Sequence, residues 1–158
     1  MKWKLVTLLT LTAMMAGCDC TDQQPVSVSD SEGVGAGTGT SDVAKEFASQ
    51  TEDKVFYAFD KFDLTPTSRT SLEGQAKWLQ NNKDVSVEVQ GYCDKRGPVA
   101  YNDRLGQRRA DAAAHYLVHL GVDESRVKTV SFGNRVTLVP GTTEAAYAQN
   151  RVAITVAH

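Results

Sequence analysis

The chain has 158 residues and a formal net charge of −2, from 17 Lys and Arg against 19 Asp and Glu. This near balance, without a basic patch or a long run of like charges, argues against a protein that binds nucleic acid. The length is enough for one modest folded domain together with targeting and linker segments.

The N-terminal residues have the pattern of a secretory signal. A short basic start at residues 1–4 precedes a mostly apolar run at residues 5–15, which is too short to span a bilayer. Small residues then lead to Cys18, and this sequence resembles the lipobox of bacterial lipoproteins, with Met15 where leucine is usual. The resemblance implies cleavage before Cys18 and a lipid on that cysteine, which would anchor the protein to a membrane. An ordinary cleaved signal with an unrelated cysteine is the alternative.

A polar segment follows the signal. Residues 19–40 are rich in Ser, Gly, Thr and Asp, a composition typical of a flexible linker. A short helix is expected at residues 41–53. The predicted organisation is therefore a signal at residues 1–17, the lipidated cysteine and linker at residues 18–53, and one domain at residues 54–158.

Hydrophobic periodicity predicts the elements of the domain. Strands are expected at residues 55–59, 85–90, 127–132 and 151–156, because apolar side chains are concentrated or alternate there. Helices are expected at residues 66–81, 102–120 and 144–149. Thr65 before Pro66 is a typical helix start, and Gly121 a typical stop. The order β-α-β-α-β-(α)-β predicts an α+β domain with a mixed four-stranded sheet and helices packed on it.

One charged residue lies on an apolar helix face. Leu105, Ala113 and Leu117 belong to a stripe at helical spacing, and Arg109 falls on the same stripe. A guanidinium facing the core needs a carboxylate or a pocket, because an unpaired buried charge is costly. Asp94, in the preceding loop, is a candidate partner. The residues alone favour a structural salt bridge, with a ligand clamp near the expected helix start as the alternative.

Three longer motifs resemble the OmpA-like peptidoglycan-binding family. Residues 59–64 read F-D-K-F-D-L, similar to its F-D-x-x-D-I opening, and residues 147–151 resemble its closing motif. Residues 91–110 match its G-x-x-D-x-R-G-x-x-x-Y-N-x-x-L-G-x-R-R-A core almost position by position. With the signal and linker, the layout is similar to that of the lipoprotein members of the family in Gram-negative bacteria. This resemblance makes the ligand interpretation the favoured one.

The resemblance also implies a function. The family binds the peptide stem of peptidoglycan, chiefly diaminopimelate, without covalent chemistry, so neither enzymatic activity nor a cofactor is expected. Carried over by position, Asp94 would accept hydrogen bonds from the diaminopimelate ammonium, and Arg109 would clamp a carboxylate. Asp60 and Arg96 would make polar contacts or fix the loop shape, and Leu105 would pack on the aliphatic part of the ligand.

Four positions depart from the family pattern. Tyr92 and Cys93 replace the usual His or Asn and Ala or Thr, which changes the expected pocket wall. Lys95 replaces a common Glu and makes the loop more positive. Val152 stands where a second Arg is usual, so the contacts of that Arg are not carried over.

The expected partners and location follow from the same resemblance. They are peptidoglycan, the outer membrane through the N-terminal lipid, and the periplasmic propeller protein of the Tol system, which serves envelope integrity and cell division. The domain would face the periplasm. Asp19 leaves inner-membrane sorting open, because enteric bacteria tend to retain lipoproteins with aspartate at that position.

Two other functions are weighed. The domain could be a docking module for a partner protein with little direct wall binding. It could also be an enzyme with Cys93 as its nucleophile, but no motif places a base beside that cysteine.

His115 and His119 have a metal-binding spacing, yet only two ligands are evident, so surface histidines and no metal are expected. Tyr101 is expected to be in the core or half-buried, Tyr101 and Asn102 to support the loop, and Asn102 to cap the helix.

Overall fold

The computed structural model describes residues 38–158. The predicted signal, Cys18 and most of the linker lie outside the described residues. Within this range, no helix is both long and apolar enough to cross a membrane. The elements in chain order are α1 (Thr38–Gln50), β1 (Lys54–Phe56), α2 (Pro66–Asn81), β2 (Val87–Tyr92), α3 (Val99–His119), η1 (Glu124–Arg126), β3 (Val127–Gly133), α4 (Glu144–Asn150) and β4 (Val152–Ala157). The predicted α+β order is confirmed.

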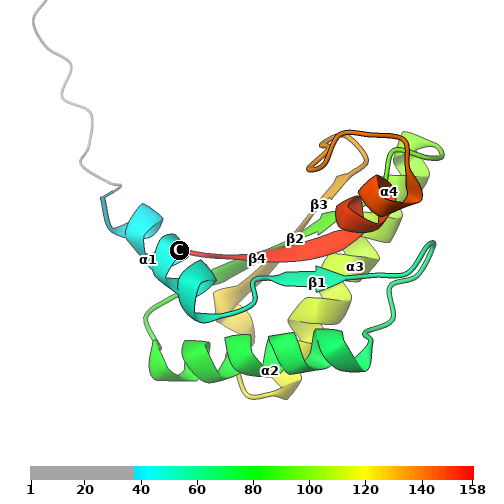
Figure 1. Ribbon diagram of the computed structural model, residues 1–158. Coiled ribbons are helices and arrows are strands. Elements are labelled where there is room, and N and C mark those ends of the chain that lie inside the picture. The colour runs from blue at the N-terminus through cyan, green and yellow to red at the C-terminus, as the bar shows by residue number, and fades with distance from the viewer. Residues whose placement is uncertain (1–37) are drawn as a thin grey trace, which may run out of the picture. The chain divides into compact units, whose positions relative to one another are not determined.

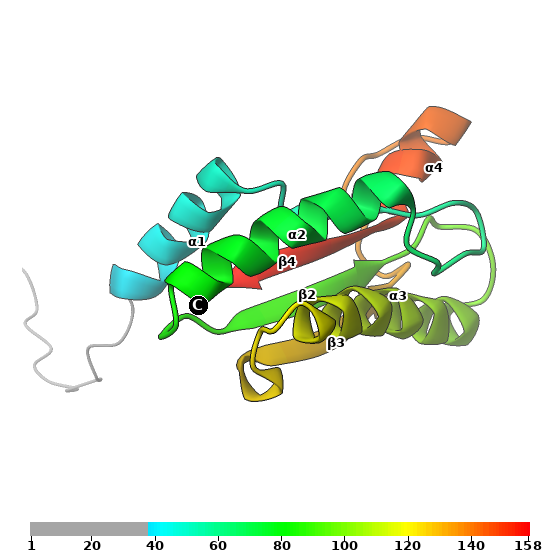
Figure 2. The same ribbon diagram turned by 90° about the horizontal axis from the view of Figure 1, so that it is seen from below.

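The four strands form one mixed sheet in the order β1-β4-β2-β3. Strand β4 is antiparallel to both β1 and β2, whereas β2 and β3 are parallel and are joined through α3. Helices α2 and α3 lie side by side across one face of the sheet (Figures 1 and 2). Strands β1, β2 and β3 end where β4 begins, so the loops after β1 and β2 meet the α4–β4 junction at one end of the sheet.

Helix α1 is the helix expected at residues 41–53, and it belongs to the globular unit. Its Phe47 is 1% exposed and packs edge-to-face on Trp78 of α2, with ring centroids 5.1 Å apart. The folded part therefore includes residues that the sequence analysis assigned to the linker. A single aromatic residue in a polar segment gives too weak a periodicity to reveal this packing.

Helix α2 begins as the sequence predicts. The Thr65 hydroxyl accepts a hydrogen bond from the Ser68 amide at 3.1 Å, and Pro66 occupies the first turn.

The side chain of the buried Gln75 in α2 has a hydrogen-bond partner for its nitrogen and for its oxygen, because it donates to Glu52 O (2.5 Å) and accepts from Thr155 Oγ1 (2.8 Å). This pairing connects α2 to β4 and gives both polar atoms of the buried Gln75 side chain a partner.

Helix α3 starts at Val99, three residues before the expected Asn102. Arg109 consequently lies in the third turn and not near the helix start. Pro98 precedes the helix with φ −66°, and its ring offers no capping side chain. Asn102 is not the cap, because its amide donates to Arg96 O (2.9 Å) and Pro98 O (3.1 Å). It closes the loop that carries Asp94 and Arg96.

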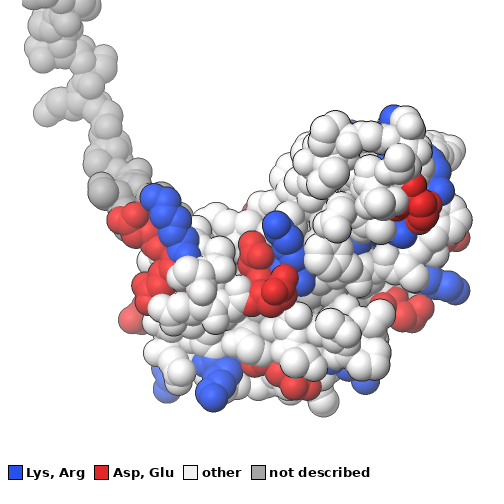
Figure 3. Space-filling view, in the orientation of Figure 1, with Lys and Arg blue, Asp and Glu red and all other residues white. Residues whose placement is uncertain are grey.

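The surface charge is mixed, as the composition predicts. In Figure 3, Lys and Arg side chains lie among Asp and Glu side chains, with no large area of one sign on the face shown. That face therefore has no continuous positive surface to which a nucleic-acid phosphate backbone would bind.

Candidate functional site

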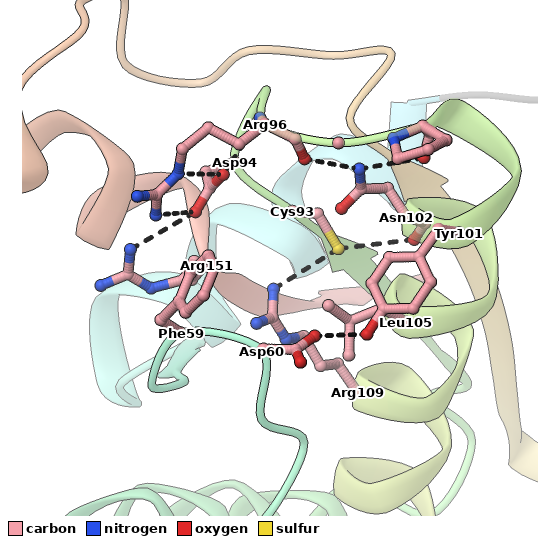
Figure 4. Close-up of a pocket in the computed structure, with 12 residues that line it drawn as sticks. Phe59, Asp60, Cys93, Asp94, Arg96, Tyr101, Asn102, Leu105, Arg109 and Arg151 are labelled. Atoms are coloured by element: carbon pink, nitrogen blue, oxygen red, sulfur yellow. Dashed lines mark hydrogen bonds and ion pairs between the residues drawn. The ribbon is translucent and has the colours of Figure 1, made fainter.

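A cavity of about 360 Å³ opens at the end of the sheet where the loops after β1 and β2 meet α3 and the start of β4 (Figure 4). It is lined by Phe59, Asp60, Cys93, Asp94, Arg96, Gly97, Pro98, Tyr101, Asn102, Leu105, Arg109 and Arg151. The structure thus brings together all five residues that the family resemblance selected. Their role in ligand binding stays a prediction.

The side chain of Arg109 crosses from α3 to the two loops and is 1% exposed. Its Nε donates to Lys61 O (2.9 Å), Nη1 to Tyr92 O (2.9 Å), and Nη2 to Ala58 O (3.2 Å). These bonds tie the loop after β1 to the end of β2. Burial lowers the pKa of Arg109, but a guanidinium stays charged in proteins.

The expected ion pair between Asp94 and Arg109 is not formed. None of the ion pairs of residues 38–158 involves Arg109, whose acceptors are backbone carbonyls and the Cys93 sulfur at 3.4 Å. Carbonyl dipoles solvate the guanidinium but do not neutralise it. The cavity therefore holds a buried positive charge without a contacting carboxylate.

Asp94 instead pairs with two other arginines. Its Oδ1 accepts from the backbone amide (3.1 Å) and Nε (3.0 Å) of Arg96, and its Oδ2 from Arg96 Nη2 (2.7 Å) and Arg151 Nη1 (3.4 Å). Burial by itself would raise the pKa of Asp94, but the hydrogen bonds and charge of Arg96, with Arg151, hold it below its usual value. Asp94 is therefore a fixed anion with a donor at each of its four acceptor positions.

Arg96 joins three segments at the rim. Its guanidinium lies between the rings of Phe59 (4.5 Å) and Tyr147 (4.3 Å), and its Nη1 is 3.4 Å from Glu144 Oε2. Such stacking suits a planar, delocalised cation. The loop after β1, the loop after β2 and α4 are thus held together by one side chain.

Arg151 is a lining residue that the sequence analysis did not select. Its Nε donates to Tyr57 O (3.2 Å), and its Nη1 contacts Glu144 Oε1 (2.8 Å) as well as Asp94. The only sequence signal was its place in the closing motif, directly before the last strand. Phe59 and Tyr101 were likewise not selected as lining residues.

A second contact fastens the loop after β1 to α3. The Tyr101 hydroxyl donates to Asp60 Oδ1, and Asp60 has a left-handed φ of 58°. Tyr101 is 45% exposed and is therefore about half-buried and not part of the core, while Asn102 supports the loop as expected through its bond to Arg96 O. Tyr101, in the first turn of α3, points toward Asp60 in the loop after β1 rather than into the core.

Cys93 lies on the cavity floor near Arg109 (Figure 4). Burial raises the pKa of its thiol to about 11, and the thiol donates to Asn102 O at 3.4 Å. Neither that carbonyl nor the Arg109 guanidinium is a base that could activate a nucleophile. In residues 38–158, no three His, Cys, Asp or Glu side chains are placed to hold a metal ion.

Comparison with known proteins defines the class. Residues 56–151 match the model of the OmpA family, and the chain belongs to that family. It is 35% identical to the peptidoglycan-associated lipoprotein of Mesorhizobium japonicum over 149 residues, covering 94% of this chain and 89% of that protein. It is also 42% identical to the peptidoglycan-associated lipoprotein of Haemophilus influenzae, covering 66% of this chain and 69% of that protein.

A solved structure confirms the predicted fold. The crystal structure of the peptidoglycan-associated lipoprotein from Burkholderia pseudomallei aligns with a TM-score of 0.66 and 33% identity, covering 67% of this chain and 90% of that chain. The predicted OmpA-like domain with its mixed four-stranded sheet is therefore correct.

Proposed function

We propose that the protein is a lipid-anchored periplasmic protein that binds the peptide stem of peptidoglycan without covalent chemistry and so ties a membrane to the cell wall. The observation that carries this proposal is Arg109, a buried cation that lines a cavity and contacts no carboxylate of residues 38–158. A ligand carboxylate would supply the missing charge. The names of the relatives, which associate them with peptidoglycan, point in the same direction.

The end of a diaminopimelate side chain has the matching chemistry. It carries a carboxylate and an ammonium on one carbon, whereas the cavity offers a guanidinium beside the carboxylates of Asp60 and Asp94. Four of the five N–H groups of Arg109 already have acceptors, which leaves one on Nη2 for the ligand. The ammonium would take the place of the longest bond to Asp94, the 3.4 Å contact from Arg151, or bind Asp60.

Membrane attachment through Cys18 completes the tether. The lipid, the outer-membrane location and the Tol propeller protein as a partner rest on the lipobox and on the family resemblance. Mass spectrometry of the N-terminal peptide after membrane fractionation tests the first two. An unmodified residue 18, or recovery of the protein in the soluble periplasmic fraction, would contradict the anchor.

The binding test uses two natural forms of peptidoglycan. The full chain should be recovered with purified sacculi that contain diaminopimelate, and much less with lysine-type peptidoglycan, because lysine lacks the second carboxylate. Arg109→Lys keeps the positive charge but loses the planar fork, so it should bind diaminopimelate sacculi more weakly. Circular dichroism of the variant controls for folding. Equal recovery of the wild type on both forms would contradict the proposal.

Docking of a partner protein is the second candidate. The exposed apolar side chains Phe59, Val99 and Tyr101 lie at or next to the cavity, where a protein surface could cover them. Photo-crosslinking from position 99 in cells separates the two functions. Crosslinks to protein without wall fragments would favour docking over wall binding.

A further inference from the structure

Two arginines that line the cavity, Arg96 and Arg151, are each shared between two carboxylates of different exposure. On one side is Asp94, whose side chain is 6% exposed. On the other is Glu144, whose side chain is 65% exposed and whose oxygens lie 3.4 Å from Arg96 Nη1 and 2.8 Å from Arg151 Nη1. The first is fixed by burial. The second is exposed in both of its ion pairs, although Arg151 itself is only 8% exposed, so water and other anions can reach and replace the Glu144 carboxylate.

The charge of Glu144 also balances the net charge of the residues that line the cavity. The charged residues that line the cavity are three arginines and two aspartates, Arg96, Arg109, Arg151, Asp60 and Asp94, which leaves one positive charge. The carboxylate of Glu144 neutralises that charge from the rim. The Glu144 carboxylate thus occupies the position to which this positive charge would attract the carboxylate of a ligand.

The position of Glu144 lets it leave at little cost. It is the first residue of α4, a helix of 7 residues that follows the exposed segment 135–143. The α4 helix keeps a separate hold on the site through Tyr147, which stacks on Arg96 at 4.3 Å. Rotation of the Glu144 side chain into solvent therefore removes one contact from each guanidinium group without unfolding the helix, while both keep their contact with Asp94.

We propose that Glu144 competes with a ligand carboxylate for Arg96 and Arg151 and so weakens the binding of acids in the cavity. This inference rests on the proposed function, because it takes diaminopimelate peptide as the ligand. Glu144 is then an internal substitute for one ligand carboxylate, and α4 sets the affinity of the site.

The variant Glu144→Gln tests the competition, because it keeps the size of the side chain and removes its charge. The probe is the tripeptide L-Ala-γ-D-Glu-meso-diaminopimelate, titrated into the full chain by calorimetry. Glu144→Gln should bind at least about two- to fivefold more tightly than the wild type, because an exposed ion pair such as that with Arg96 accounts for that range and the pair with the buried Arg151 adds to it. Damage to the site would weaken binding, so the sign of the change distinguishes the two. Glu124→Gln, an exposed carboxylate in η1 outside the cavity, should bind like the wild type.

Three further probes identify what Glu144 competes with. Each is the same tripeptide with one of its three carboxylates, two on diaminopimelate and one on the γ-linked D-Glu, converted to an amide. The gain from Glu144→Gln should disappear for one monoamide and persist for the other two. A gain that persists for all three, or no gain with the unmodified tripeptide that the wild type binds, would overturn the inference and leave the proposed function intact. Failure of the wild type to bind the unmodified tripeptide would instead overturn both.

Discussion

Gly106 of α3 lies directly against Gly91 of β2. A Cβ atom on Gly91 would overlap the carbonyl oxygen of Gly106, and a Cβ on Gly106 would overlap Ser131 Oγ of β3. This close approach brings α3 down onto the parallel pair of strands. The short distance between α3 and the sheet therefore fixes where Leu105 and Arg109, which lie near Gly106 on the helix, enter the cavity.

Gly106→Ala should therefore destabilise the domain. Overpacking a tight contact costs about 1–3 kcal/mol, because the Ser131 hydroxyl can rotate aside but the backbone of Gly91 and Gly133, 3.0 and 3.3 Å from the added Cβ, can give way only by moving the sheet. The midpoint of urea unfolding measures the change. Gly74→Ala is the matched control, because no atom beyond its own stretch of helix lies within 4 Å of a Cβ built at that α2 position. That control should be more stable than the wild type by about 0.5–1 kcal/mol, since alanine favours the helix. Two variants of equal stability would show that α3 does not touch the sheet as described.

Asp94→Asn should destabilise the fold as well as weaken ligand binding. The amide keeps the shape but cannot accept from all four donors of Arg96 and Arg151, and it leaves their charges unbalanced. The loss should be about 1–3 kcal/mol in urea unfolding. Asp42→Asn removes one carboxylate from an exposed pair with Lys45 and should have no measurable effect. A stability equal to that of the wild type would mean that the arginines do not depend on Asp94.

Asp94 also predicts how stability depends on pH. Its folded pKa lies below its usual value, so the unfolded chain takes up the proton first as the solution becomes acidic. The stabilisation is present above the ordinary aspartate pKa of about 3.9 and is lost as the pH falls through the folded pKa. Unfolding midpoints measured between pH 6 and pH 2 should fall more steeply for the wild type than for Asp94→Asn. Parallel curves would contradict the pKa shift.

Cys93 should resist alkylation in the folded protein. With a thiol pKa of about 11, only about one thiol in a thousand is ionised at pH 8, against about one quarter for an ordinary cysteine. Modification of Cys93 by iodoacetamide, followed by peptide mass spectrometry, should be at least about 100-fold slower than in urea-unfolded protein. A rate equal to that of the unfolded chain would show that the thiol is neither buried nor held by Asn102 and Arg109.

Local patterns predicted the elements well but placed some boundaries incorrectly. The second strand was expected at residues 85–90 and forms at Val87–Tyr92. Val85 is used differently, because its carbonyl accepts from Arg126 Nε at 2.8 Å, a contact between residues 41 positions apart. Alternation of valines shows where a strand exists, whereas its ends depend on such distant partners.

The sequence predicted which residues form the site, but it did not predict their ion-pair and hydrogen-bond partners. The family motifs located Asp94 and Arg109, yet the second arginine of Asp94 is 57 residues away in the chain, at position 151. The acceptors of Arg109 are mostly backbone carbonyls, including those of Lys61 and Ala58. Every residue carries a carbonyl, so no side-chain pattern could single these out.

Helix α1 and the cavity lie at opposite ends of strand β4. Its Phe47 is anchored in the core, and Figure 1 places this helix beside the C-terminal end of β4, whereas the cavity lies where β4 begins. In a protein held by its N-terminal segment and by a ligand in the cavity, tension would act along the strands. Hydrogen bonds between strands run across that direction, so the bonds of β4 to both neighbours would share a mechanical load in shear rather than open one at a time.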